Sequence, residues 1–325
     1  MKHVSRTYSL PGMAMALVPS LAIGCMGLDD GSRGPFIDPD EQVREARAQQ
    51  ALYDGAWPDA PDPGDKRWAP ETNLRDFPKL PRLTEAQLAT ERAHAVSAGP
   101  ATEVVQIETN GDETTVTIYD PAPGVTPEAL ADELRANGKP GVQVIKHEPG
   151  SVSNLSPNDC AYGYARTYTC PVSFWVNNGR SNPFVIFVDH SSAEWPVSSV
   201  VPKWNQVVGI DSGYRWNFCP AGPGGRWCVD VYSGNYNTLW EGKTTLTWES
   251  GAHIGAFTSA FVQLNSRHTP MGWTRNNTTT HELGHVLGLG HNGFVGDVMW
   301  ELPSMREDLG GENRTLLESV YSIVR

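Results

Sequence analysis

An α+β fold is predicted for this chain because it contains both β-rich stretches and stretches with the pattern of helices. Short stretches rich in β-branched and aromatic residues, bounded by Gly, Pro and Asn, indicate strands. Between them, apolar residues three and four positions apart indicate helices. With 325 residues, of which 39% are hydrophobic, the chain is long enough for one large or two moderate domains with a buried core.

The amino-acid composition and the charge bear on the kind of fold and on whether the protein binds nucleic acid. The 11 Trp, 10 Tyr and 25 Pro are typical of a loop-rich fold packed around aromatic side chains. The formal charge is −12, and residues 29–150 alone hold 23 acidic against 12 basic residues. Nucleic-acid binding needs clustered Lys and Arg, so we expect no nucleic-acid partner. The acidic part of the chain is most simply a soluble surface.

Residues 1–25 have the pattern of an export signal. Lys2 and Arg6 precede a charge-free stretch from Leu10 to Gly24, which is too short to span a bilayer as a helix. Its end, Ala22-Ile23-Gly24-Cys25, resembles a bacterial lipoprotein box, which implies lipidation of Cys25; ordinary signal cleavage is the alternative. We therefore expect an exported protein, extracellular or in the cell envelope, whose only membrane contact is a lipid anchor.

Residues 26–100 are predicted to form a tether and linker with short helices. Helical composition occurs at 41–53 and again at 84–98, whereas 57–81 is rich in Pro and charge. Thr84 and Gln87 have the spacing of a capping box at the start of the second helix.

Residues 101–150 are predicted to form a small ββαβ module. Asn110-Gly111 is a strong hairpin signal between its first two strands, and Thr126 is a candidate helix cap. The predicted elements are strands at 103–107 and 114–119, a helix at 126–137 and a strand at 141–146. The module contains no chemical motif, so it is a pro-segment, an accessory domain or a spacer.

Residues 151–325 contain the other four cysteines, which read as disulfides in an exported chain. Four cysteines allow three connectivities. We favour Cys160–Cys170 and Cys219–Cys228, because each pair brackets a short hairpin-like stretch. A structural zinc site with four cysteine ligands would need closer pairs.

The elements expected within 151–325 alternate between strands and helices. A helix at 196–208 has an apolar side built from Val and Trp, and a final helix covers 314–323. Strands are expected at 172–176, 184–189, 214–218, 227–232, 243–248 and 256–264. A helix at 277–287, capped by Asn277 or one of Thr278, Thr279 and Thr280, completes the set.

The helix at 277–287 carries a metal-binding pattern. His281 and His285 are four residues apart, so both imidazoles project from one helix face and can share a Zn²⁺. Glu282 can reach the metal site without being a ligand. Gly288 can end the helix with a positive φ, which lets the chain turn back and present His291 as a third ligand. A fourth coordination position would stay open, as in catalytic zinc sites.

The pattern H-E-x-x-H-x-x-G-x-x-H from His281 to His291 resembles the zinc motif of the metzincin metalloproteases. Met299, eight residues after His291, resembles the Met-turn of their matrixin (matrix-metalloprotease-like) branch. The resemblance implies a twisted, mostly parallel sheet with an edge strand, an active-site helix, the Met-turn and a C-terminal helix. It also implies one catalytic Zn²⁺, Glu282 as general base, and hydrolysis of a protein or peptide substrate that pairs with the edge strand, here at about 253–259.

Some family features lack a counterpart. Trp300 follows Met299, so no tyrosine is assigned to the metal. His190, His253 and His268 match no second zinc site residue by residue and are expected to be surface or satisfied polar histidines. Calcium is common in the family, but no D-x-[DN]-x-[DN]-G loop is present.

Two questions stay open at this point. Matrixin pro-segments often block the metal with a cysteine, but the only cysteine before Cys160 is Cys25, so an acidic side chain of residues 26–150 would have to replace it. A spacer role for 26–150 is the alternative.

The rival functions are an inactive zinc-containing binding or adhesion module of the cell envelope, and an envelope lipoprotein that zinc only stabilises.

Overall fold

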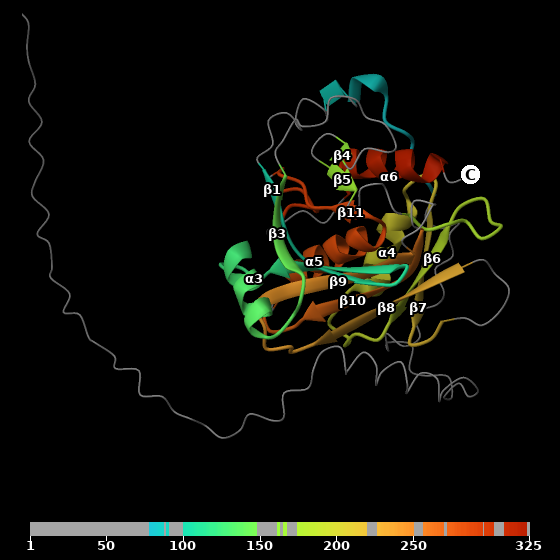
Figure 1. The fold of residues 1–325 in the computed structure, drawn as a ribbon. Helices are drawn as coiled ribbons and strands as arrows, with labels where there is room; N and C mark the ends of the chain where they lie inside the picture. Colours follow the sequence, from blue (N-terminus) through green and yellow to red (C-terminus); the bar gives the residue numbers. More distant parts are fainter. Residues whose placement is uncertain are drawn as a thin grey trace, which may run out of the picture. The chain divides into compact units, whose positions relative to one another are not determined.

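An eight-stranded sheet in the order β3-β1-β2-β9-β10-β8-β6-β7 carries the fold of the computed structural model (Figure 1). A second sheet has three short strands in the order β11-β5-β4. The strands of the large sheet are β1 (Ala101–Asn110), β2 (Glu113–Pro121), β3 (Val142–His147), β6 (Phe184–Asp189), β7 (Asp211–Trp216), β8 (Arg226–Gly234), β9 (Trp240–Glu249) and β10 (Phe257–Asn265). Those of the small sheet are β4 (Ala161–Tyr162), β5 (Ala165–Thr167) and β11 (Leu289–Gly290). The helices are α3 (Pro127–Ala136), α4 (Val197–Asn205), α5 (Gly272–Val286) and α6 (Gly311–Ile323).

The structure describes part of the chain, all within one compact unit that spans Pro39–Arg325. The described residues are 78–87, 89–90, 100–147, 161–162, 165–167, 174–219, 226–249, 256–269, 272–294, 296–301 and 309–323. The predicted signal and Cys25, most of the predicted tether, the Cys160–Cys170 pair and His253 lie outside these residues. No helix among those ranges is long and apolar enough to cross a membrane.

The large sheet is parallel at one end and antiparallel at the other. Strand β6 is parallel to both β7 and β8, and β8 is parallel to β10. From β9 onward the pairing is antiparallel, so β9 joins the parallel part to β2, β1 and β3. The strands predicted as a separate small module are therefore the antiparallel end of the same sheet.

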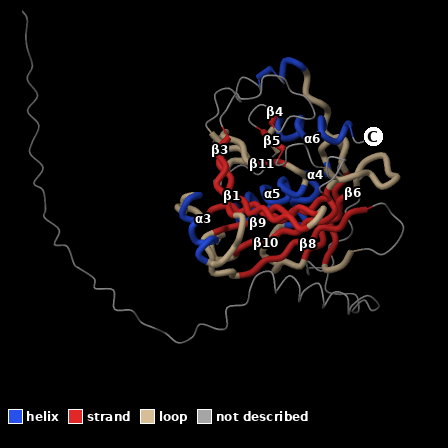
Figure 2. The backbone as a smooth tube through the Cα atoms, viewed as in Figure 1, coloured by secondary structure: helices blue, strands red, loops and turns tan. Residues whose placement is uncertain are grey.

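Helices cover both faces of this sheet. On one face, α4 and α5 share the main core with strand residues such as Val116 and Ile118 of β2 and Phe187 of β6. α5 packs on β9 and β10 (Figure 2). On the other face, α3 places Leu130 and Leu134 in a smaller apolar cluster with Tyr119 of β2 and Val104 of β1. Alternate residues of β2 thus serve two different cores, as the two-residue period of a strand dictates.

Local signals predicted the N-terminal elements well. Gly111 turns the β1–β2 hairpin with φ of 61°. Thr126 caps α3 by accepting a hydrogen bond from the Ala129 amide at 3.2 Å. The capping box is also present: Gln87 Oε1 accepts from the Thr84 amide at 2.9 Å, and Thr84 Oγ1 accepts from the Gln87 amide at 3.3 Å.

The C-terminal part contains two wrong predictions. Residues 174–176, the described part of the strand expected at 172–176, form no strand. The helix expected from Asn277 begins at Gly272, so the threonines proposed as caps lie inside α5. Thr280 Oγ1 donates to the Asn276 carbonyl at 2.7 Å, which satisfies the hydroxyl within the helix rather than at its end. The Cys219–Cys228 disulfide is confirmed, with Cα atoms 5.9 Å apart.

Glu312, in the first turn of α6, gives a test of how that helix packs against the rest of the fold. Its side chain is buried, and burial raises the pKa of its carboxyl from 4.5 to about 7. The folded chain therefore binds a proton that the unfolded chain has lost, so Glu312 makes stability fall as pH rises from about 4.5 to about 7. Glu312→Gln should raise the free energy of unfolding by about 3 kcal/mol at pH 8 and change it little at pH 4. Denaturant unfolding of both proteins at the two pH values checks this; an equal difference at both would contradict it.

Candidate metal centre

Helix α5 and the turn after it set the positions of the three histidines. His281 and His285 lie one helical turn apart, and the helix ends at Val286. Gly288 then has φ of 101°, a conformation that glycine adopts at low cost. Leu289 and Gly290 form β11, and His291 follows directly. The sharp turn brings His291 back towards the helix face that carries the other two imidazoles, as the sequence predicted.

Each imidazole is oriented through its Nδ1 atom. His281 Nδ1 lies 2.6 Å from the Val298 carbonyl, and His285 Nδ1 lies 2.7 Å from the Leu289 carbonyl. A carbonyl only accepts, so each Nδ1 carries a proton, and Nε2 is the atom that each ring directs at the centre of the group. His291 is held in the same way, with Nδ1 2.6 Å from the carbonyl of Thr102 in β1. Metal-bound histidines are oriented by this kind of outer contact.

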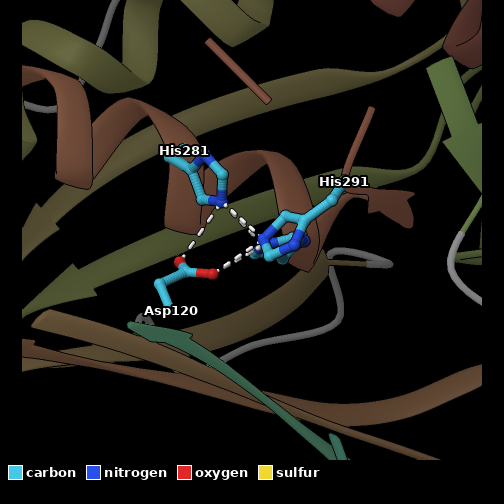
Figure 3. Close-up of side chains that lie close together, drawn as sticks. Asp120, His281 and His291 are labelled. Atoms are coloured by element: carbon cyan, nitrogen blue, oxygen red, sulfur yellow. Dashed lines mark hydrogen bonds and ion pairs between the residues drawn. The ribbon is translucent and has the colours of Figure 1, made fainter. Parts of the chain in front are cut away.

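The three Nε2 atoms converge on one point together with Asp120 of β2. Figure 3 shows the Asp120 carboxylate directed at His281 and His291. His281 Nε2 lies 3.0 Å from that of His285 and 3.1 Å from that of His291. One carboxylate oxygen of Asp120 lies 2.7 Å from His291 Nε2, and the other lies 3.2 Å from His281 Nε2. All four residues are buried, and their ligand atoms lie within 4.8 Å of one another.

This cluster could hold a metal ion, and its spacing fits one. The three Nε2 atoms and the Asp120 carboxylate surround one small buried space, where a cation would lie within reach of all four residues. Nitrogen atoms bound tetrahedrally at ~2.0–2.1 Å lie roughly 3.3 Å apart. The observed separations of 3.0 and 3.1 Å are close to that value. Three imidazoles and one carboxylate oxygen are ligands that transition metals such as zinc accept.

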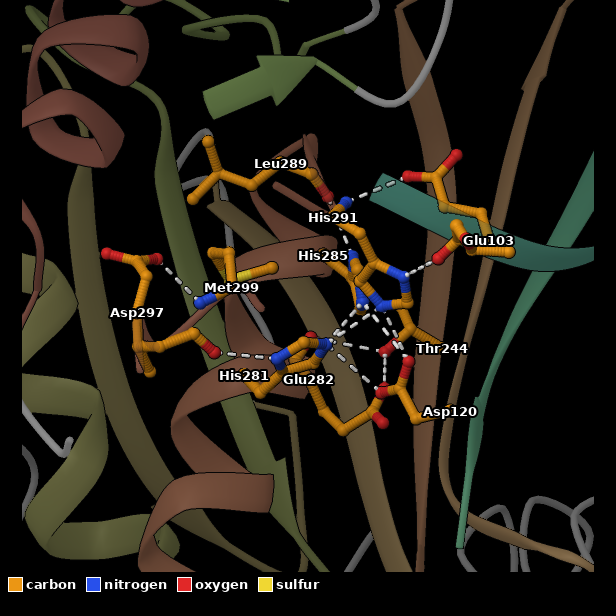
Figure 4. Close-up of polar contacts among 12 residues, drawn as sticks. Glu103, Asp120, Thr244, His281, Glu282, His285, Leu289, His291, Asp297 and Met299 are labelled. Atoms are coloured by element: carbon orange, nitrogen blue, oxygen red, sulfur yellow. Dashed lines mark hydrogen bonds and ion pairs between the residues drawn. The ribbon is translucent and has the colours of Figure 1, made fainter. Parts of the chain in front are cut away.

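Glu282 stands beside the cluster rather than among its members (Figure 4). Its carboxylate accepts a hydrogen bond from Thr244 Oγ1 of β9 at 2.5 Å and is hydrogen-bonded to Asp120. Burial, and then the charge of Asp120, raise the pKa of Glu282 well above its usual value. Gly242 of β9 faces it, and a side chain at this position would overlap the carboxyl group. Close approach of β9 to the helix therefore depends on a glycine.

The pKa of Asp120 is shifted in the opposite direction to the pKa of Glu282. Burial opposes its ionisation, but His281, the hydrogen bond with Glu282 and His291 together hold the pKa of Asp120 well below its usual value. Burial raises the pKa of the neighbouring Glu241 well above its usual value, and the charge of Asp120 adds to the effect. The cluster therefore carries its negative charge on Asp120, the carboxylate that faces the imidazoles.

Met299 forms the floor under helix α5, in the position predicted. It is fully buried, and a methyl group on Gly284 would come within 2.5 Å of its Sδ atom. The turn around it is fixed by Asp297 Oδ1, which accepts from the Met299 amide at 2.8 Å and from the Asn292 side chain at 2.7 Å. The same oxygen accepts from Asn313 of α6 at 2.8 Å, which ties the turn to the last helix.

Strand β1 holds His291 from the other side. Besides the Thr102 carbonyl on its ring, Glu103 Oε1 accepts a hydrogen bond from the His291 amide at 2.8 Å. Glu301, just after the Met299 turn, accepts from the Thr102 amide. His291 is thus tied to β1, a strand that lies about 190 residues earlier in the sequence.

The structure brings His281, Glu282, His285, His291 and Met299 together, as the motif indicated. Sequence reasoning missed Asp120, Glu103 and Thr244, because nothing near them in sequence forms a motif. The one available signal was general: an acidic side chain of residues 26–150 in place of the absent cysteine was one of two alternatives, and it had no assigned position. The Cys219–Cys228 disulfide lies outside the cluster.

His190 and His268 are satisfied polar groups, as expected. His190 contacts Asn217 Oδ1 at 2.7 Å and Asp230 Oδ1 at 3.1 Å and stacks on Tyr232. His268 Nε2 lies 2.6 Å from the Thr238 carbonyl. Neither joins a group of potential metal ligands in the described part of the chain.

The edge strand was placed wrongly from the sequence. Residues 257–259 belong to β10, which lies between β9 and β8 inside the sheet. The strand next to Glu282 is β9, and its other neighbour is β2. No protein-family model matches the chain, and no curated protein matches it.

Proposed function

We propose that the protein is a zinc-dependent endopeptidase that resembles the matrixin branch of the metzincins. The observation that carries the proposal is the position of Glu282. A buried carboxyl group lies against a convergent set of three imidazoles without being one of the ligands. A site that only stabilises the fold has no need for such a group.

In this proposal the three histidines would bind the metal and Glu282 would transfer a proton. His281, His285 and His291 would hold Zn²⁺ through their Nε2 atoms, each oriented by a carbonyl on Nδ1. Zinc bound there would supply a Lewis acid and lower the pKa of a water molecule. Glu282 would accept a proton at its carboxylate and later donate it to the departing amine. Thr244, which donates to Glu282, would keep that carboxylate aimed at the site.

A second candidate is a closed, structural zinc site. One observation favours it: Asp120 brings the number of potential protein ligands to four, and structural zinc sites have four protein ligands. Under this reading the metal would only join β2 to α5, in keeping with an envelope protein that zinc stabilises or one that binds a partner. The two candidates differ in whether a metal-loaded protein ever turns over a peptide.

The test measures zinc content and hydrolysis of casein and of a fluorogenic peptide library by the full chain. The protein is loaded with zinc and assayed both intact and after limited proteolysis. Hydrolysis that a chelator removes and that added zinc restores supports the endopeptidase. A protein that holds one zinc per chain yet cleaves nothing in either state would support the structural site instead.

Export and lipidation at Cys25 are proposed from the sequence alone, and mass spectrometry of cell-derived protein tests them.

A further inference from the structure

We propose that β2 lies where a peptide substrate would lie, and that Asp120 at its end is a fourth protein ligand of the metal. The proposal rests on the peptidase function and adds its regulation: the described fold is the latent form. In this form the N-terminal strands and the metal hold each other in place. Three sets of contacts carry the inference, from β9, from Asp120 and from His291.

Both edges of strand β9 are paired with other strands. On one side it pairs with β10, and on the other it pairs with β2 from Glu113 opposite Glu249 to Asp120 opposite Gly242. β9 is also the strand that touches Glu282, through Thr244. A peptide that binds beside the metal by extending this sheet needs a free edge of β9, because its backbone must exchange hydrogen bonds with that strand. The edge it needs is the one β2 occupies.

Asp120 faces the metal because it lies on the same face of β2 as Val116 and Ile118, which belong to the core shared with α5. The register shifts between Asp120 and Pro121, where the strand ends. Pro121 has no amide hydrogen to donate to the ladder beyond this point. The carboxylate then reaches His291 Nε2 at 2.7 Å and His281 Nε2 at 3.2 Å. A metal held by three imidazoles and this carboxylate has no position left for a substrate carbonyl.

The third ligand depends on the same N-terminal strands. The Thr102 carbonyl orients the ring of His291, and Glu103 fixes its backbone amide. Loss of an outer contact of this kind typically lowers metal affinity 10- to 100-fold. Removal of β1 and β2 would therefore take away one ligand and two contacts that position another. Metal should be bound most tightly in the closed form, and it should in turn slow the departure of the strands.

The first arm of the test measures zinc affinity of the full chain by competition with a chelating dye. Asp120→Ala should weaken zinc binding by at least about 10- to 100-fold, since a direct ligand is worth no less than an outer contact. Asp120→Asn keeps the shape of the side chain and serves as the second variant if the alanine variant folds poorly. The matched control is Glu113→Ala, which removes the same charge at the exposed far end of β2. Equal affinities of wild type, both Asp120 variants and the control would overturn the ligand role.

The second arm uses a specific protease site inserted between His147 and Ala161, the described residues on either side of the connection. Peptide hydrolysis and retention of the N-terminal piece are measured before and after the cut. We expect hydrolysis only after the piece has left, and faster release from Asp120→Ala or in the presence of chelator. Equal hydrolysis by intact and cut protein would overturn the blocking role of β2. If no sample hydrolyses peptide while Asp120→Ala still loses zinc affinity, the endopeptidase proposal fails and the ligand role stands.

Discussion

Glu282→Gln should remove peptide hydrolysis while zinc stays bound. General acid–base catalysis contributes about 10²- to 10⁴-fold to rate, so the cut, zinc-loaded protein should lose at least that factor. The amide can neither accept nor deliver a proton, but it is close in size to the carboxyl group and can still accept from Thr244. Zinc stoichiometry and the rate on a fluorogenic peptide are measured on the same samples.

Glu312→Gln is the matched control for that variant. It makes the same chemical change at another buried carboxyl with a raised pKa, outside the metal cluster. It should leave both zinc content and hydrolysis as they are in the wild type. If Glu282→Gln kept its rate, or lost its zinc together with its rate, the assignment of Glu282 as a base that is not a ligand would be wrong.

His285→Ala should lose the metal and the stability that the metal provides. A ligand present at a thousandfold excess over its dissociation constant stabilises the folded state by about 4 kcal/mol. In domains of about 150–250 residues a change of this size corresponds to roughly 8–16 °C in melting temperature. Chelator should therefore lower the melting temperature of the wild type and leave that of His285→Ala unchanged.

The control for the histidine variant is His268→Ala. The imidazole of His268 contacts the Thr238 carbonyl and lies outside the cluster of ligands. Its removal should leave zinc content and the response to chelator unaltered. A melting temperature of the wild type that does not respond to chelator, in protein shown to contain zinc, would refute the stabilising role of the metal.

Interactions between residues near in sequence were predictable, and those between distant residues were not. The spacing of His281, His285 and His291 and the turn at Gly288 are local, so the pattern alone was enough to predict their arrangement. The hairpin at Gly111 and the cap at Thr126 were predictable for the same reason. Asp120 stands 171 residues before His291, and its role depends on the pairing of β2 with β9. Alternation of residues identifies a strand but not its neighbour.

The wrong predictions have the same physical origin. The stretch at 253–259 was chosen as an edge strand from its position before the metal motif, yet its described part lies in β10 between two other strands. The threonines at 278–280 resemble caps by composition, but burial against the sheet and against α4 lets the helix continue through them. Tertiary packing overrides a local preference worth less than about 1 kcal/mol per residue. The α+β class is confirmed, whereas the likeness to metzincins stays a prediction.

Val116 and Ile118, on the face of β2 towards α5, belong to the same core as Leu283 and Val286 of the metal helix. Lifting β2 therefore uncovers part of the core that supports the helix, which a hinged surface loop would not do. Local openings of this kind approach the free energy of global unfolding and are correspondingly rare. The rate at which β2 leaves the metal site is then close to the unfolding rate of the whole fold. A cut between His147 and Ala161 makes this opening irreversible, because the N-terminal strands can then dissociate.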